Sequence, residues 1–305
     1  MLRALREVLP WDRVTLVVAS GTHEASHRAV PDEHRDRPVV VHGSGSTVVD
    51  LGRTTRGTRI RLLDVVAEAD LVVATGRVRP HYFAGLSAGA KAIFPGVALA
   101  EDILANHLLK SEPSARLGRV HDNACRLDME EAARALPGAA FLLNLLCDVD
   151  GTPIAAAAGD LVAAHRALVE PARRTFTVQA PRSPVVIVAD RPPVSSSLYQ
   201  ASKLLPPAGA LLDVGGVVIL VADLAQGIGP VERVNQGIYQ LGVRPQLPAQ
   251  HRVLLVSELA EEIAARSYAE PRRSLHAALD EALAATGATR AVALWRAGEL
   301  IAVPE

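Results

Sequence analysis

The sequence predicts an α/β protein made of two α/β domains with mostly parallel sheets. Short apolar runs rich in β-branched residues end at Gly or Ser, as buried parallel strands often do. These runs alternate with helix-like segments, and the alternation begins again after about residue 180. A length of 305 residues suits two domains, and we place the boundary near residues 166–180.

In the first half, Val14–Ala19 (VTLVVA) and Ala69–Thr75 (ADLVVAT) predict two buried strands that each lead into a glycine turn. Phe141–Asp148 and Gly151–Ala157 predict a hairpin, because Asp150-Gly151 is a strong turn dipeptide. Weaker strands are expected at Arg37–Val41 and Arg59–Arg61. Helices are expected at Leu2–Leu9, Asp64–Glu68, Leu99–Leu109, Met129–Leu136 and Asp160–Arg174.

In the second half, strands are expected at Ser183–Ala189, Gly215–Val221 and Val253–Ser257, and helices at Ser196–Leu205 and Ser274–Thr286. Ligands of open α/β sheets bind beyond the carboxyl ends of the strands. The polar residues of greatest interest follow such ends, and they are His23, His81, Tyr199, Gln200 and Lys203.

Composition excludes several classes of protein. A formal net charge of −1 gives no basic field for nucleic acid, and no apolar run approaches the roughly 20 residues of a membrane span. Cys125 and Cys147 form no CxxC pair, which fits a reducing cytosol. The first residues lack the apolar core of a secretory signal. We therefore expect a soluble, cytoplasmic protein with no nucleic-acid or membrane partner.

Lys91 is the most informative single residue. Of 32 basic residues only three are lysines, at positions 91, 110 and 203, so arginine serves almost everywhere else. Arginine cannot replace a lysine that must lose its proton and act as a nucleophile. Lys91 stands among small and apolar residues, in Gly85–Gly96. It is a candidate for covalent chemistry, although a tightly packed turn with a surface lysine would leave the same pattern.

Three histidines are further candidates. His23 and His81 each follow a predicted strand, and two imidazoles facing one substrate would suit acid–base chemistry at its two faces. His107 stands at a predicted helix end and is a possible ligand for nickel, zinc, copper or iron. Each alone also fits a plainer interpretation, namely an exposed loop histidine, a packed histidine, or a histidine stabilised by a helix dipole.

In the second half, Tyr199 and Lys203 are spaced i and i+4 on a predicted helix, so they share a face with Gln200 nearby. A hydroxyl, an amide and an ammonium together could bind a carboxylate or phosphate. A solvated helix face is the alternative. The chain has no GxGxxG or GxxxxGK[ST] motif, so it shows no standard nicotinamide or ATP signature.

Taken in order, these segments resemble the nickel-dependent lactate racemase family. The resemblance runs over nearly the whole chain, and its motifs are GTH at Gly21–His23, PHYFAG at Pro80–Gly85, KAIFPG at Lys91–Gly96, NH at Asn106-His107 and LYQASK at Leu198–Lys203. Each motif alone is weak, but five in order are specific. The resemblance implies an isomerase, a racemase or epimerase of a small 2-hydroxy acid.

The resemblance also implies a cofactor, the nickel-pincer nucleotide, which is a pyridinium-3-thioamide-5-thiocarboxylate mononucleotide that holds nickel. Lys91 would tether it through a thioamide and His107 would be a nickel ligand. His23 and His81 would be the paired acid–base residues of a proton-coupled hydride transfer, and Tyr199, Gln200 and Lys203 would approach the substrate. Proteins of cofactor biosynthesis would be needed for maturation.

By the same resemblance, residues 1–168 would form the cofactor-binding domain, residues 176–305 the C-terminal α/β domain, and the active site would lie in the cleft between them. The family's N-terminal segment with an Asp-x-Thr-Arg type motif is expected to be missing. Ala90 precedes Lys91, at a position where members of the family commonly have arginine. Two alternatives stay open: a non-catalytic or divergent cofactor-binding paralogue, and a Schiff-base enzyme that uses Lys91 alone. Lactate, malate, a longer 2-hydroxy acid and a sugar acid all remain candidate substrates.

Overall fold

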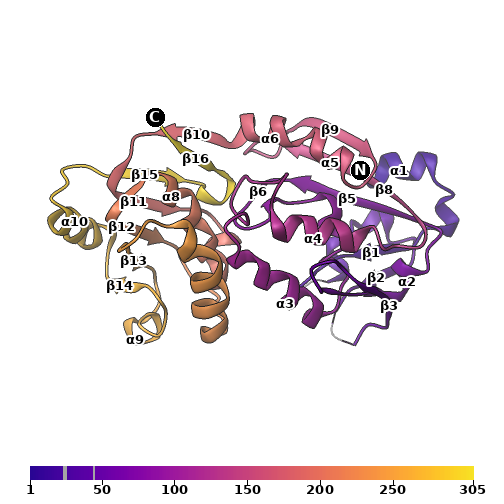
Figure 1. The fold of residues 1–305 in the computed structure, drawn as a ribbon, viewed down its shortest axis with the longest axis horizontal. Coiled ribbons are helices and arrows are strands. Elements are labelled where there is room, and N and C mark those ends of the chain that lie inside the picture. The colour runs from indigo at the N-terminus through magenta and orange to yellow at the C-terminus, as the bar shows by residue number, and fades with distance from the viewer. Residues whose placement is uncertain (23–25, 44) are drawn as a thin grey trace. The chain divides into compact units, whose positions relative to one another are not determined.

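The computed structural model describes residues 1–22, 26–43 and 45–305, and Figure 1 shows its helices and strands. The chain divides into two compact units. Unit 1 contains Met1–Arg79, Ser87–Leu109 and Val120–Ala172, and unit 2 contains Pro80–Leu86, Lys110–Arg119 and Arg173–Glu305. Two short segments from the first half of the sequence therefore belong to unit 2, a division that no local sequence pattern indicates.

The described residues of unit 1 form three small sheets. Strands β5 (Leu71–Val78) and β8 (Ala139–Cys147) are parallel, and β9 (Pro153–Gly159) returns antiparallel to β8 as the hairpin that the sequence predicts. The other two sheets are the parallel pair β1 (Leu16–Val18) and β2 (Val39–Val41) and the antiparallel pair β3 (Val48–Arg53) and β4 (Arg59–Leu63).

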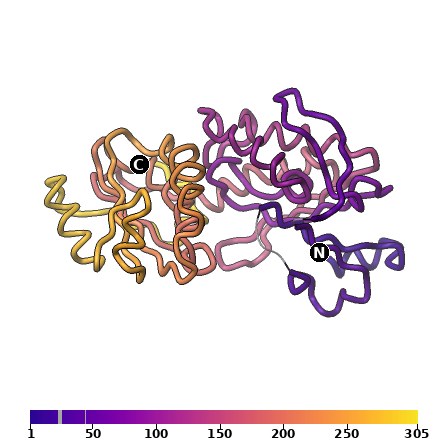
Figure 2. The backbone as a smooth tube through the Cα atoms, turned by 90° about the horizontal axis from the view of Figure 1, so that it is seen from below, coloured from indigo at the N-terminus to yellow at the C-terminus, as the bar shows by residue number. Residues whose placement is uncertain are grey.

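The helices of unit 1 differ in how deeply they are buried. Eight of the ten residues of α4 (Ala124–Ala133) are buried, so this helix passes through the core. By contrast, α1 (Leu2–Val8) has no buried residue, and the N-terminal segment lies to one side of its unit in Figure 2. The remaining helices are α2 (Asp64–Ala67), α3 (Ala100–Leu108), α5 (Ala163–Ala167) and α6 (Val169–Phe176), the last of which continues into unit 2.

Unit 2 is built on a five-stranded sheet in the order β14-β13-β12-β11-β15, in which every pair is parallel. The strands are β11 (Ser183–Ala189), β12 (Leu212–Val221), β13 (Arg252–Val256), β14 (Glu270–Arg272) and β15 (Val292–Trp295). Val185, Ile219 and Leu254 of this sheet form a fully buried core with Ala278 and Ala282 of α10 (Leu275–Thr286).

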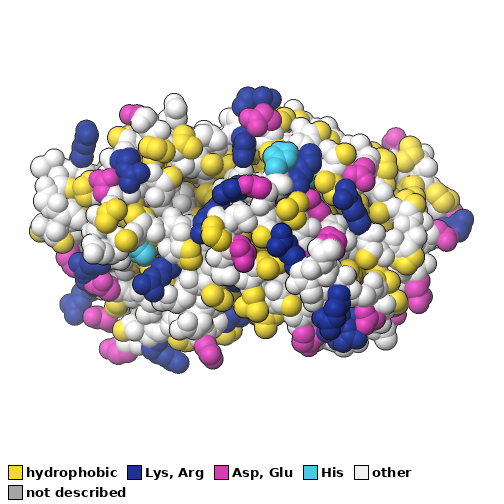
Figure 3. All heavy atoms as spheres, viewed as in Figure 1, with side chains coloured by type: hydrophobic (Ala, Val, Ile, Leu, Met, Phe, Trp, Pro, Cys, Tyr) yellow, Lys and Arg dark blue, Asp and Glu magenta, His cyan; other side chains and the backbone are white. Residues whose placement is uncertain are grey.

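Around this sheet lie α7 (Leu198–Ala201), α8 (Leu205–Leu211), α9 (Glu261–Ala264) and a π-helix at Arg233–Val243. A parallel pair joins β10 (Thr177–Ala180) to β16 (Ile301–Pro304), and an antiparallel pair joins β6 (Pro80–His81) to β7 (Gly85–Leu86). Positive and negative side chains are interspersed over the face drawn in Figure 3.

The predicted class, α/β with mostly parallel sheets, is confirmed. The helix expected at Met129–Leu136 is α4 at Ala124–Ala133, and three further element predictions need correction. The expected helix at Asp160–Arg174 is two helices, α5 and α6, because Pro171 lacks the backbone N–H that would continue the first. The expected helix at Ser196–Leu205 is α7 followed by a 3₁₀ turn, with Pro206 and Pro207 at the start of α8.

The third correction concerns β1. The run Val14–Ala19 was expected to form a buried strand, but β1 spans only Leu16–Val18, and only Leu16 is buried. Its two valines are half-buried, because β1 pairs with β2 along one edge only. Among the helices of the described residues, none is both long and apolar enough to cross a membrane.

Candidate active site

Lys91 lies in a 3₁₀ turn, Gly89–Ala92, that follows a strained residue. Ala88 adopts φ +61° and ψ −159°, a backbone region that side-chain-bearing residues rarely enter and that costs about 1–3 kcal/mol. Strain of this kind persists only where the surroundings hold it in place. The turn that carries Lys91 is therefore fixed by contacts made elsewhere in unit 1.

Side chains from three separate elements provide those contacts. Arg126 of α4 donates from Nη1 to the Ala88 carbonyl at 3.1 Å. Asn144 of β8 accepts a hydrogen bond at Oδ1 from the Gly89 amide at 2.9 Å. His165 of α5 has its Nε2 2.9 Å from the Ser87 carbonyl oxygen. Because a carbonyl can only accept, His165 donates from Nε2, which leaves its Nδ1 unprotonated in the neutral ring.

The glycines near Lys91 are required by packing within the chain. A Cβ on Gly89, which has φ +65°, would lie 2.8 Å from the His165 ring. A Cβ on Gly96 would lie 2.1 Å from the Ala92 carbonyl oxygen. The Gly96 carbonyl accepts from the Gly21 amide at 2.9 Å, so the loop after β1 rests against the far end of the Lys91 turn. The packed-turn interpretation of these glycines is thus correct, whatever Lys91 does.

The electrostatics of this turn shift the protonation equilibrium of Lys91 towards its neutral form. Burial, and after it the Arg126 charge, lower the pKa of the Lys91 ammonium from 10.5 to about 8. Arg126 itself has no exposed surface, and burial lowers its pKa to about 10. His165, 1% exposed, has its pKa lowered to about 3, first by burial and then by the Arg126 charge. At neutral pH His165 is therefore uncharged, while Lys91 has an appreciable fraction of free amine.

His107 lies in the last turn of α3 and is partly exposed. Its neighbour Asn106 is fully buried and anchors that turn, since its Nδ2 donates to Asp128 Oδ2 at 2.7 Å and to the Cys125 carbonyl at 3.2 Å. Asp128 in turn accepts hydrogen bonds from the hydroxyls of Thr54 and Thr58. This buried network fixes the end of α3 and hence the position of the His107 backbone.

His81 belongs to unit 2, in β6 opposite Gly85 of β7. Its Nδ1 accepts a hydrogen bond from the Ala84 amide at 3.2 Å, so the neutral ring carries its proton on Nε2. Phe83 meets the imidazole edge-on with ring centroids 4.6 Å apart, which limits rotation of the ring. The neutral imidazole is thus held with its N–H at Nε2, where it can act as a hydrogen-bond donor. His23, its predicted partner, lies outside the described residues.

The three predicted substrate residues are close together in unit 2. Lys203 Nζ donates to Gln200 Oε1 at 2.6 Å and lies 4.7 Å from the centre of the Tyr199 ring. The exposed Arg233 guanidinium stands 5.3 Å from the same ring centre. This places Tyr199 and Lys203 on one face, as their spacing predicts, and adds a second cation that the sequence did not single out.

The backbone of α7 is fixed by two sets of hydrogen bonds. The first amides of the helix, those of Leu198 and Tyr199, donate to the carbonyls of Gly227 and Ile228 at 3.1 Å each. The Ser202 hydroxyl donates to the Leu198 carbonyl at 2.6 Å and accepts from the Tyr268 hydroxyl at 2.8 Å. The helix that carries Tyr199 and Gln200 is therefore supported at both ends.

Sequence reasoning missed Arg126, Asn144 and His165. One of them left a visible signal, because Asn144 interrupts the apolar run FLLNLLC of β8. A polar side chain in a buried strand needs a hydrogen-bond partner, and here the partner is the Gly89 amide. Arg126 and His165 have no comparable signal, since charged residues on helices usually face solvent.

Comparisons with known proteins agree with one another. A family model described as the lactate racemase N-terminal domain matches residues 1–118. The lactate racemase of Lactiplantibacillus plantarum is 29% identical, in a match that covers 94% of this chain and 76% of that protein. The lactate racemase of Thermoanaerobacterium thermosaccharolyticum is 33% identical, and there the match covers 74% of this chain and 54% of that protein. The chain thus spans about half the length of the second relative.

Solved structures extend the likeness to the fold. The structure of the lactate racemase apoprotein from T. thermosaccharolyticum matches with a TM-score of 0.85 and 26% identity, over 99% of this chain and 81% of that one. A protein from Thermotoga maritima matches with a TM-score of 0.72 at 14% identity, which shows a shared fold alone. The chain is an isomerase of the racemase class and belongs to the lactate racemase family.

Proposed function

We propose that this chain racemises or epimerises a small 2-hydroxy acid, using a nickel-pincer nucleotide attached to Lys91. The observation that carries the proposal is the Lys91 turn. Its amine has a pKa of about 8, and its backbone follows a strained residue that Arg126, Asn144 and His165 hold in place. An amine that forms an amide-type bond must attack in its neutral form, and this turn provides one near neutral pH.

The residues present fit the cofactor. Lys91 would hold it covalently, and the imidazole of His107 would supply one nitrogen to the nickel ion. Among residues 1–22, 26–43 and 45–305, no group of three or more His, Cys, Asp or Glu side chains is arranged to hold a metal. The remaining nickel donors would then come from the carbon and two sulfurs of the nucleotide. When bound, this group supplies reversible acceptance of a hydride.

The chain's own residues would handle the protons and the orientation of the substrate. Racemisation at C2 requires that the 2-hydroxyl lose its proton as C2 becomes planar, and that the oxygen be protonated again afterwards. Because Nδ1 of His81 accepts from the Ala84 amide, Nε2 is the nitrogen that would hydrogen-bond the substrate oxygen and, in the imidazolium form, return the proton to it. We assign removal of the proton to His23, and the two roles exchange for the opposite enantiomer.

Lys203, Gln200 and Tyr199 would bind the carboxylate of the acid. The Lys203 ammonium already interacts with the Gln200 amide and the Tyr199 ring, so its position is restricted before substrate binds. A positioned ammonium stabilises negative charge more effectively than a mobile one, because less reorganisation accompanies the reaction. The proposal also includes proteins of cofactor biosynthesis as the partners that mature the chain.

The test is racemisation of single enantiomers of lactate, malate, a longer 2-hydroxy acid and a sugar acid by the matured protein, with deuterium at C2. We expect the product of one of these acids to retain its deuterium, because a transferred hydride does not exchange with water. His81→Ala should abolish turnover, whereas Arg182→Ala, which removes a surface ion pair with Asp213, should leave it unchanged. Cofactor-loaded protein that turns over none of the four acids would instead identify a non-catalytic paralogue.

A further inference from the structure

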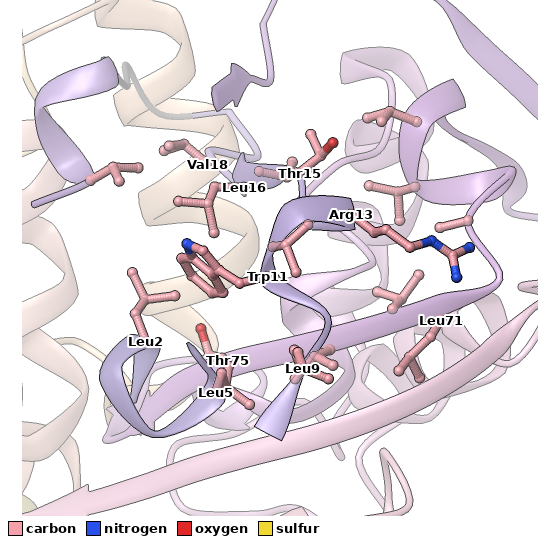
Figure 4. Close-up of a pocket in the computed structure, with 18 of the residues that line it drawn as sticks. Leu2, Leu5, Leu9, Trp11, Arg13, Thr15, Leu16, Val18, Leu71 and Thr75 are labelled. Atoms are coloured by element: carbon pink, nitrogen blue, oxygen red, sulfur yellow. The ribbon is translucent and has the colours of Figure 1, made fainter. Parts of the chain in front are cut away.

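The two units offer a small acid very different surroundings. Unit 1 has a cavity of about 870 Å³ that is lined mostly by leucine and valine side chains (Figure 4). Among the described residues that line it, the one arginine, Arg13, is paired with Asp70 at 3.7 Å. By contrast, Tyr199 in unit 2 has two cations beside one ring, Lys203 and Arg233. Attraction between opposite charges therefore favours the surroundings of Tyr199 as the place for an anion.

Arg233 brings to this ring a charge that no carboxylate of the described residues neutralises. Its guanidinium carbon lies 5.3 Å from the centre of the Tyr199 ring, and Lys203 Nζ lies 4.7 Å from the same point. Within the described part of the chain, Arg233 forms no ion pair and the Tyr199 hydroxyl forms no hydrogen bond. Two like charges so close to one another repel, and an anion that contacts both would offset the repulsion.

The backbone on both sides of this contact is fixed. Arg233 is the first residue of the π-helix, a rare kind of helix that often occurs at functional sites. The Val234 amide donates to the Pro230 carbonyl at 3.0 Å, which holds the first turn. A Cβ on Gly229, which has φ +85°, would lie 3.4 Å from the Tyr199 Cβ, so the loop after β12 packs directly on Tyr199. The elements that carry the ring and the guanidinium are thus positioned before any ligand binds.

The distance between the two cations suits two anionic groups of one small acid. Because both lie beside the same ring, Lys203 Nζ and the Arg233 guanidinium carbon are at most about 10 Å apart, the sum of their distances to its centre. The carboxyl carbons of a four-carbon dicarboxylate are about 4 Å apart, given bonds of about 1.5 Å. A charged hydrogen bond adds about 2.8 Å at each end, so such an acid can reach both cations. An acid with a single carboxylate would leave one of them without an anion.

We propose that Arg233 selects the substrate class, and that the substrate is a 2-hydroxy dicarboxylate whose first carboxylate binds Lys203 and whose second binds Arg233. This inference rests on the function proposed above and narrows its candidate acids to malate and close dicarboxylate relatives. The planar fork of the guanidinium can make two parallel hydrogen bonds to a carboxylate, which an ammonium cannot. An uncharged group at the end of the acid would have no such partner, so the second cation discriminates between acids of equal length.

The probes are malate and 2-hydroxybutyrate, which share the chain length and the 2-hydroxyl and differ in the second carboxylate. Their dissociation constants are measured by NMR titration of the full chain before cofactor maturation. We expect malate to bind at least about tenfold more tightly, the effect of one charged hydrogen bond. Arg233→Met should abolish this preference, and Arg233→Lys, which keeps the charge but not the fork, should retain part of it. Arg244→Met removes an exposed arginine directly after the same helix and should retain it in full.

Lys203→Met should weaken the binding of both acids, because both carry the first carboxylate. Equal affinity for malate and 2-hydroxybutyrate, or a preference that survives Arg233→Met, would overturn the proposal. So would Arg233-dependent binding of 3-phosphoglycerate that is tighter than that of malate, which would assign the second group to a phosphate. Matured protein that prefers malate in this way but racemises no acid would contradict the proposed function alone. Equal kcat/KM for racemisation of malate and 2-hydroxybutyrate would instead overturn the selection by Arg233 alone.

Discussion

The charge of Arg126 should contribute to the reactivity of Lys91. Arg126→Met removes a buried cation that lowers the pKa of Lys91, together with hydrogen bonds to the Ser87 and Ala88 carbonyls. We expect the pKa of Lys91 to rise from about 8 towards 10.5, but not to reach it, because burial is the larger cause and remains.

The effect on reactivity is large enough to measure. A lysine with a pKa of about 8 has about 9% of its amine neutral at pH 7, against about 0.03% at 10.5, so the whole shift corresponds to about 300-fold in reactive amine. The pH profile of acetylation at Lys91, followed by peptide mass, should therefore have its midpoint near pH 8 and move upward in Arg126→Met. Arg134→Met changes an exposed arginine at the end of the same helix and should leave the midpoint in place. An unchanged or lower midpoint in a folded Arg126→Met protein would refute the reasoning.

Three further predictions concern stability and substrate binding. The pKa of His165 is about 3 in the folded protein against 6.5 for an ordinary histidine, so below pH 6.5 the folded state binds fewer protons than the unfolded state. The free energy of unfolding, measured by urea titration, should therefore fall by about 2 kcal/mol between pH 7 and pH 5. His165→Gln should lose most of this pH dependence. Ala88→Gly relieves the positive φ and should raise the free energy of unfolding by about 1 kcal/mol, whereas Ala90→Gly, where φ is ordinary, should not. Lys203→Met should raise the KM of the 2-hydroxy acid about 10- to 100-fold, the cost of a charged hydrogen bond, and an unchanged KM would remove Lys203 from the substrate site.

The sequence predicted those parts of the fold that local periodicity encodes. β11 spans the predicted Ser183–Ala189, and the hairpin β8-β9 turns at Asp150-Gly151 as expected. Prolines, which act locally, explain the helices that were predicted too long. By contrast, α4 begins five residues before its predicted start, because its burial on nearly all sides leaves no amphipathic pattern to read.

Long-range contacts account for what could not be predicted at the site. Lys91 was found from its rarity and its small neighbours, but the partners that hold its turn lie far along the chain. The hydrogen bonds of Arg126, Asn144 and His165 to this segment span 38, 55 and 78 residues. No spacing rule connects such positions. The strain at Ala88 could not be predicted from the sequence either, because alanine, unlike glycine, does not indicate a backbone with positive φ.

The central claim is that Lys91 carries the cofactor, and peptide mass mapping of the matured protein tests it most directly. The account predicts one nucleotide adduct, on the peptide that contains Lys91, with attachment that becomes faster as the pH rises towards 8. Lys91→Arg should carry neither adduct nor stoichiometric nickel, whereas Lys110→Arg should carry both. Matured protein without an adduct at Lys91, or Lys91→Arg protein that still racemises a 2-hydroxy acid, would contradict the account.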